Sequence, residues 1–145
     1  MCIRDSIYHA VEQGSYLGSP LTGVDVTTEV WQRYAKQWRL RLVHTTPVPT
    51  VPPTAVLTAA ELLSLNGQYR AENEVAILLA SSAGISWKVA DGPARSLQAE
   101  ARDVLFEPTN PRVRYIFRRD SGGAVTGMLR RNENRAIVYV KLRQP

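Results

Sequence analysis

Few of the side chains that commonly perform catalysis occur in this sequence in a pattern that could work together. The two histidines, His9 and His44, lie far apart, and neither has a neighbouring acid or nucleophile that would orient it. No Ser-x-x-Lys or Tyr-x-Asn motif occurs, and both common glycine-rich phosphate loops are missing. Residues 80–84 have the outline of a nucleophile elbow, but the residues after them predict a strand where that elbow needs a helix. We therefore predict no catalytic residue and no cofactor in this chain.

The composition excludes several further classes of site. The chain has 145 residues, enough for one domain with a short extension, and 44% of them are apolar, which suits a globular core. The single cysteine, Cys2, rules out an internal disulfide framework, and with only two histidines we predict no metal site. No apolar run approaches the ~18 residues of a membrane-spanning helix.

Arginine accounts for fifteen of the eighteen cations in this chain of net charge +5. Arg112, Arg114 and Arg118 lie on one face of a predicted strand and would form a row that could bind carboxylates or phosphates. No aromatic residue interleaves this row, as a platform for single-stranded nucleic acid would need, so we expect no nucleic-acid partner. The alternative is cross-strand charge pairing, because acidic residues lie on the neighbouring strands and turns: Glu100, Asp103, Glu107, Asp120 and Glu133.

Five aromatic residues could line a ligand cavity if the strands around them close into a barrel: Trp87, Phe106, Tyr115, Phe117 and Tyr139. They could equally fill the core of that barrel. A domain of fewer than 90 residues has little core to spare, which favours the filled core.

Residues 57–145 change to a period of two, which is typical of strands. Thr58 and Glu61 form a capping-box pattern that predicts one or two helical turns before Asn66-Gly67. Turns rich in Gly, Pro, Asn and Asp separate most of the segments that follow. We therefore predict a mainly β domain, an antiparallel up-and-down meander of about eight strands that forms a barrel or a strongly curled sheet. The predicted strands cover residues 68–73, 74–81, 84–90, 95–100, 103–107, 112–119, 124–131 and 135–143.

The N-terminal part follows a different pattern. Residues 7–24 have no sustained period and predict a loop, whereas residues 26–43 predict one amphipathic helix. Residues 45–56 hold four prolines and predict an extended, semi-rigid linker, the clearest domain boundary in the chain. The apolar stripe of the helix would consist of Val30, Trp31, Tyr34, Trp38 and Leu42.

Residues 1–6, Met-Cys-Ile-Arg-Asp-Ser, resemble the translation of a transposase end sequence used to prepare sequencing libraries. Such segments are left out of fold reasoning. We expect a longer natural reading frame to enter the sequence at Ile7, with residues 7–44 as the remnant of an upstream domain. The alternative is that residues 1–6 are a genuine short N-terminus.

Three segments of the C-terminal half carry a family pattern. Residues 57–69 combine Leu-Thr-Ala-Ala-Glu-Leu with Leu-Asn-Gly-Gln-Tyr, residues 103–106 read Asp-Val-Leu-Phe, and residues 117–127 follow F-x-R-D-x-x-G-x-V-x-G. Together they resemble the small β domain at the C-terminus of β-lactamase-related serine hydrolases, the penicillin-binding, esterase and D-aminopeptidase group. The resemblance covers residues 57–145, and it marks a fold rather than a reaction.

The resemblance implies a lipocalin-like domain of about eight strands whose family carries its catalytic Ser, Lys and Tyr in an upstream domain. None of those positions falls within this chain. The leading hypothesis is therefore a non-catalytic accessory domain of a larger serine hydrolase, truncated here. Its partner would be the missing upstream catalytic domain of the same polypeptide, and the resemblance implies a periplasmic or secreted location.

Two alternatives from other classes stay open. The first is a free-standing small-ligand-binding β-barrel that uses the aromatic lining. The second is an arginine-rich binder of nucleic acid or another anionic polymer that uses the row of Arg112, Arg114 and Arg118.

Overall fold

The computed structural model describes residues 2–16, 19–132 and 135–143, without the side chains of residues 16–22. The chain divides into two compact units, residues 1–50 and residues 51–145, and each unit is described by itself. The division falls inside the predicted linker over residues 45–56.

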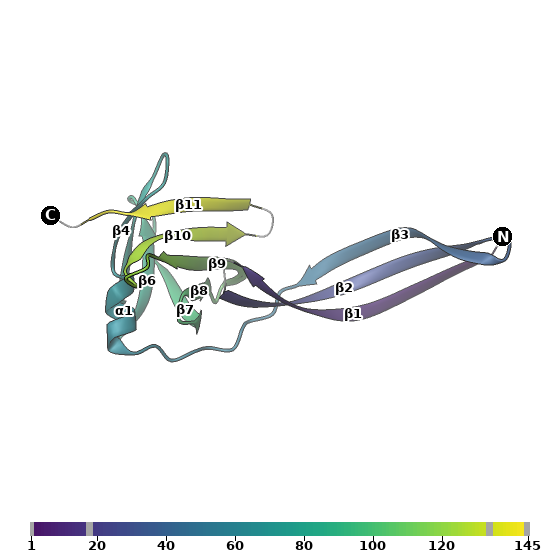
Figure 1. Cartoon of the computed structure of the whole chain (residues 1–145), viewed down its shortest axis with the longest axis horizontal. Coiled ribbons are helices and arrows are strands. Elements are labelled where there is room, and N and C mark those ends of the chain that lie inside the picture. Colours follow the sequence, from purple (N-terminus) through teal and green to yellow (C-terminus); the bar gives the residue numbers. More distant parts are fainter. Residues whose placement is uncertain (1, 17–18, 133–134, 144–145) are drawn as a thin grey trace. The chain divides into compact units, whose positions relative to one another are not determined.

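The second unit is a closed antiparallel barrel of eight strands, as the sequence predicts (Figure 1). The strands follow one another around the barrel in chain order, and β11 returns to pair with β4. This order confirms the up-and-down meander and is in keeping with a lipocalin-like barrel. The strands are β4 (Gly67–Arg70), β5 (Val75–Ser81), β6 (Gly84–Val89), β7 (Arg95–Ala101), β8 (Val104–Glu107), β9 (Asn110–Arg119), β10 (Val125–Asn132) and β11 (Arg135–Lys141).

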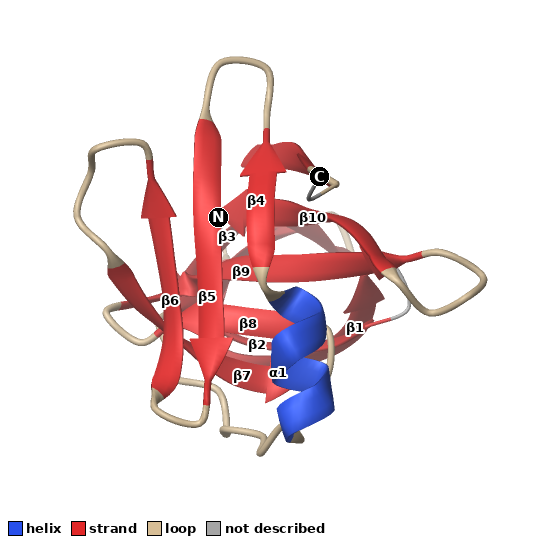
Figure 2. Cartoon of the chain, turned by 90° about the vertical axis from the view of Figure 1, so that its left-hand side faces the viewer, coloured by secondary structure: helices blue, strands red, loops and turns tan. Residues whose placement is uncertain are grey.

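One short helix, α1 (Ala59–Leu65), precedes the barrel and packs against β5 (Figure 2). The predicted capping box starts it: the Thr58 hydroxyl accepts from the Glu61 amide, and the Glu61 carboxylate accepts from the Thr58 amide. Leu65 at the end of α1 is fully buried and belongs to the barrel core. The helix therefore closes one end of the barrel.

The hairpin between β9 and β10 is built as its sequence predicts. The Asp120 carboxylate accepts from the amides of Gly122 and Ala124, and Gly123 takes a φ of +82°, which a side chain would disfavour. A Cβ on Gly127 would collide with the carbonyl oxygen of Tyr139 on β11. Glycine there allows the close approach of two strands.

The first unit is a three-stranded antiparallel sheet and not the predicted loop and helix. Its strands are β1 (Ile3–Tyr16), β2 (Ser19–Tyr34) and β3 (Gln37–Val48), in that spatial order. The predicted helix over residues 26–43 is therefore wrong, and so is the loop over residues 7–24, where residues 17–18 lie outside the described residues. Residues 45–48 of the predicted linker are the end of β3.

A tight hairpin explains why residues 26–43 do not form a helix. Tyr34 pairs with Gln37, and Ala35 between them has a φ of +55°, so the chain reverses where a helix would continue. The segment before the turn is rich in β-branched and aromatic residues, which favour strands. Within the sheet, the Glu29 carboxylate accepts hydrogen bonds from the Tyr8 hydroxyl on β1 and the Trp31 indole.

Pro47 is compatible with β3 because β3 is an edge strand of the sheet, where a missing backbone donor can be tolerated. Residues 49–58 then have no regular secondary structure, in agreement with the later part of the predicted linker. The Ala55 amide donates to the carbonyl of Ala99 on β7, so this segment is held against the barrel.

Candidate functional site

Four of the five predicted lining aromatics meet in the interior of the barrel. Trp87 is at the centre, with ring centroids 5.4 Å from Tyr115 and 5.3 Å from Tyr139 in edge-to-face packing. Phe117 lies 6.0 Å from Tyr69, which in turn lies 6.1 Å from Trp87. These spacings are those of packed aromatic pairs. The contacts favour the filled core over the ligand cavity.

Phe106, the fifth predicted lining residue, is buried but does not join this cluster. Its neighbour Leu105 is in the core, so alternation along β8 turns Phe106 to the opposite face. There the Arg114 guanidinium lies 5.7 Å from the centre of its ring. Phe106 therefore does not line the barrel interior.

The predicted arginine row does not form a single anion site. Arg112, Arg114 and Arg118 do alternate with the inward-facing core residues of β9. Arg114, however, makes an ion pair with Glu100 on β7 in which both side chains are about 10% exposed. Arg112 is half-buried and Arg118 is exposed. At Arg114 the structure thus follows the cross-strand pairing that the sequence offered as the alternative.

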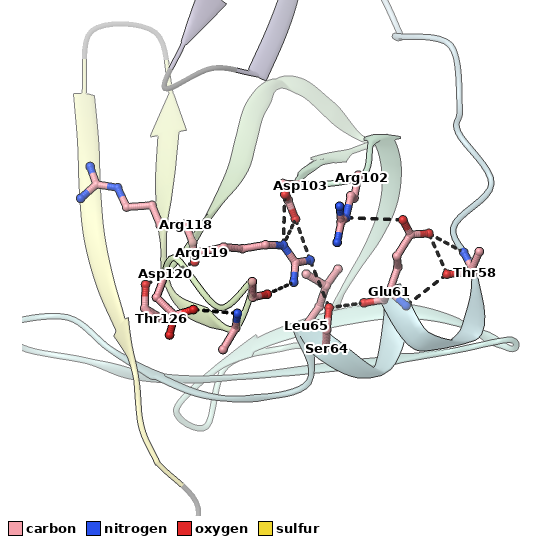
Figure 3. A network of polar contacts seen from close by, with 12 residues as sticks. Thr58, Glu61, Ser64, Leu65, Arg102, Asp103, Arg118, Arg119, Asp120 and Thr126 are labelled. Atoms are coloured by element: carbon pink, nitrogen blue, oxygen red, sulfur yellow. Dashed lines mark hydrogen bonds and ion pairs between the residues drawn. The ribbon is translucent and has the colours of Figure 1, made fainter.

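The end of the barrel beside α1, which we call the base, is held by Arg119, the last residue of β9 (Figure 3). Its Nε donates to both oxygens of Asp103, at 2.9 and 3.2 Å. One terminal nitrogen donates to the carbonyl of Gly123 at 2.8 Å, and the other donates to the Ser64 hydroxyl of α1 at 3.1 Å. One guanidinium therefore ties the helix to two hairpins of the barrel.

A lysine and a tyrosine complete the base. The Lys141 ammonium donates to the carbonyl of Ser64 at 2.8 Å, and the Tyr69 hydroxyl donates to the carbonyl of Leu65. Burial, assisted by the nearby Arg119, lowers the pKa of Lys141, and burial raises the pKa of Tyr69. These groups satisfy the carbonyls at the end of α1, which is a structural task.

The opposite end, where β8 turns into β9, holds a second polar group, which we call the distal cluster. Its centre is Glu107, only 4% exposed. The Glu107 carboxylate accepts from Arg95 at 3.1 and 3.3 Å and from the Tyr115 hydroxyl. A terminal nitrogen of Arg130 lies 4.0 Å from the same carboxylate. The distal cluster consists of Arg95, Glu107, Tyr115, Arg130, Tyr139 and Glu74.

Tyr139 reaches this end from β11, and its hydroxyl donates to the Glu74 carboxylate. Burial raises the pKa of Tyr115 and of Tyr139, and the hydrogen bonds to Glu107 and Glu74 raise them further. Burial also opposes the charge of Arg130, but Tyr115, Tyr139 and Glu107 together outweigh it and raise the pKa of the guanidinium. Both tyrosines are thus neutral donors and Arg130 is a cation at neutral pH.

The sequence analysis did not predict that Arg130 faces inward. A register shift between Val125 and Gly127 changes the alternation along β10, so that Val125 and Met128 both lie in the core. Arg130 then pairs with the inward-facing Tyr115. The only sequence signal for this was Gly127 within a strand, which is typical of a bulge or a close approach.

The first unit has a shallow hollow of about 350 Å³, lined by Arg4, Ser6, Trp31 and Trp38. Two of these residues lie in the segment that resembles a library-derived sequence. The hollow is therefore no basis for a function.

The comparisons with known proteins give no relative: no family model, curated protein or solved structure matches the chain significantly. Within the described part of the chain, no group of three or more His, Cys, Asp or Glu residues is arranged to hold a metal ion. Among those same residues, no helix has the length and apolar character to cross a membrane.

Proposed function

We propose that residues 51–145 are the non-catalytic accessory β domain of a larger serine hydrolase related to β-lactamases. One observation carries the proposal: the residues that make up the family resemblance have structural tasks in this barrel. Thr58 and Glu61 cap α1, and Asp120 and Gly123 form the β9–β10 turn. A motif made of capping, turn and core residues is what a shared scaffold domain requires.

The remaining motif residues support the same reading. Tyr69 and Phe117 pack in the aromatic core, Phe106 is fully buried, and Gly127 permits the close approach of β10 and β11. Arg119 of the F-x-R-D motif joins α1 to the barrel through Ser64 and Asp103. In a fused protein, such a domain would contribute stability or domain contacts, while the chemistry takes place in the upstream domain.

The direct test is to sequence the source DNA outward from the codon of Ile7. We expect an open reading frame that continues upstream into a domain with a Ser-x-x-Lys motif and a later Tyr-x-Asn motif. A start codon at or just before Met1 would contradict it, because no upstream catalytic domain would then exist.

A second test uses the chain itself. We expect the purified 145-residue protein to leave chromogenic β-lactams and short chromogenic esters unhydrolysed above the buffer rate. Hydrolysis that follows protein concentration would show that the chain is itself catalytic and would overturn the accessory role.

A further inference from the structure

We propose that the distal cluster binds a small carboxylate-bearing ligand between Arg95 and Arg130. This inference does not depend on the proposed function, because it rests on how the charges at this end of the barrel are paired. It would hold equally for an accessory domain or for a free-standing barrel.

The first observation concerns the donors that surround the Glu107 carboxylate. One oxygen of Glu107 faces Arg95 at 3.1 Å, the Tyr115 hydroxyl, and Arg130 at 4.0 Å. Two of these donors make hydrogen bonds with that oxygen, whereas a separation of 4.0 Å is too long for one. Arg130 therefore approaches Glu107 without a hydrogen bond between the two side chains.

The second observation is a buried donor without an acceptor. The Nε of Arg130 is shielded from solvent and makes no hydrogen bond to any residue in the described part of the chain. Buried polar groups in proteins are almost always hydrogen-bonded, so such an atom indicates that an acceptor is to be supplied. Glu74, the other carboxylate at this end, already accepts from Tyr139.

The third observation is access. The side chain of Arg95 is 49% exposed and that of Arg130 is 24% exposed, so parts of both side chains are accessible to solvent although the Nε of Arg130 is buried. Because both approach the same Glu107 oxygen, their nearest nitrogens lie no more than about 7 Å apart, the sum of those two distances. One carboxylate can bridge this gap, since each N–H···O bond spans about 2.9 Å and its two oxygens add the rest.

The charge of the site favours a monoanion. Arg95 and Arg130 both face the single carboxylate of Glu107, whereas Glu74, the other carboxylate of the distal cluster, accepts from Tyr139. The cluster as a whole is therefore neutral, and its positive excess is local to the two arginines. A monocarboxylate would balance that excess, whereas a doubly charged phosphate would also meet the repulsion of the buried Glu107. The flat guanidinium fork suits a planar carboxylate as well.

The experiment titrates sodium acetate into the ¹⁵N-labelled full chain at constant ionic strength, with chloride replaced by acetate. We expect the Arg130 Nε–H and Trp87 indole resonances to shift with saturation. Arg130→Gln, which keeps a polar side chain, should weaken acetate binding at least tenfold. Arg118→Gln is the matched control, since Arg118 is an exposed arginine of β9 on the other face.

Several results would overturn the proposal. The first is a resonance shift that grows linearly with acetate concentration and does not saturate. The second is the same acetate affinity in Arg130→Gln and in the parent chain. The third is a loss of acetate binding in Arg118→Gln. Tighter binding of inorganic phosphate than of acetate would refute the monocarboxylate assignment. If Arg130→Gln does not fold, Arg95→Gln replaces it, because Arg95 is half-exposed, and unchanged acetate binding in that variant would contradict the bridge.

Discussion

Arg119 on β9 and Arg130 on β10 both point toward the interior of the barrel, and they lie at its opposite ends. Each of them approaches a carboxylate side chain. At the base, Arg119 has an acceptor for its Nε and for both terminal nitrogens: Asp103, Gly123 and Ser64. At the distal end, Arg130 lies 4.0 Å from a carboxylate and interacts with the hydroxyls of Tyr115 and Tyr139, and its buried Nε has no acceptor among the residues that the structure describes. At the base, every nitrogen of the arginine side chain thus has an acceptor, whereas at the distal end one buried nitrogen has none.

This difference separates a region built for stability from one that can accept a ligand. A buried guanidinium stabilises a fold only when its donors are satisfied, because the loss of hydration must be offset by hydrogen bonds. Arg119 meets that condition by joining α1 to the β7–β8 and β9–β10 turns. Arg130 does not meet it within the described residues, so its contribution to folding should be smaller.

The largest expected effect is a loss of stability at high pH, which involves both ends of the barrel. Tyr69 at the base and Tyr115 and Tyr139 at the distal end have raised pKa values in the fold. Above pH 10 the unfolded chain loses protons that the folded chain keeps, so the free energy of unfolding must fall as the pH rises. Urea titrations from pH 8 to pH 12 should show a decreasing midpoint.

Absorbance near 295 nm in the same samples should show these tyrosines ionising together with unfolding. Tyr115→Phe and Tyr69→Phe should each reduce the dependence on pH. A midpoint that stays constant up to pH 12 would show that the three phenols do not share a buried environment.

The next largest effect is expected at the aromatic layer between the two ends. Phe117→Ala should lower the free energy of unfolding by about 3–5 kcal/mol, because it removes a ring from a packed core. Equilibrium urea unfolding measures it. A loss below about 1 kcal/mol would mean that the strand alternation is shifted by one residue, and the assignment of Arg119 to the inward face would fail with it.

Arg119→Met tests the base directly. It keeps most of the aliphatic volume but removes the bonds to Asp103, Gly123 and Ser64, and we expect a loss of about 2–3 kcal/mol, somewhat below that for a fully buried pair. Amide exchange should rise in α1 before it rises in β5. If the amides of α1 are equally protected from exchange in the parent and in the variant, the helix is held by packing alone.

Arg130→Met is the corresponding change at the distal end and should have the smallest effect. Glu107 keeps Arg95 and Tyr115 as donors, so the stability should change by no more than about 1 kcal/mol in either direction. Thermal unfolding of this variant beside Arg119→Met gives the comparison. A loss as large as that of Arg119→Met would mean that Arg130 is a structural tie as well, and the contrast between the two ends would disappear.

The barrel could be predicted because its signals are local. Alternation along β9 assigned Tyr115 and Phe117 to the core, and the Asp120 turn and the Thr58–Glu61 capping box marked where elements begin and end. Each of these signals depends on residues only a few positions apart. Where local rules agree with one another, as they do over residues 57–145, the sequence alone determines the strands and their order.

The first unit was predicted wrongly because two periods fitted the same residues. Val30, Trp31, Tyr34 and Trp38 have helical spacing, yet Val30 and Trp31 lie on opposite faces of β2. The turn at Ala35 and the pairing of β2 with β1 decide the outcome. Pairing between strands far apart in the sequence is a tertiary property, and no window of a few residues contains it.

The sequence by itself determined the barrel domain, its aromatic core and the capped helix, because local patterns specify them. Only the tertiary structure decided which arginines enter the barrel and what they meet there. Arg119 finds Ser64 across 55 positions of sequence, and a one-residue register shift in β10 turns Arg130 toward Glu107. A charged side chain acquires its task from the acceptors that the fold brings within about 3 Å of it, and those acceptors come from distant parts of the chain.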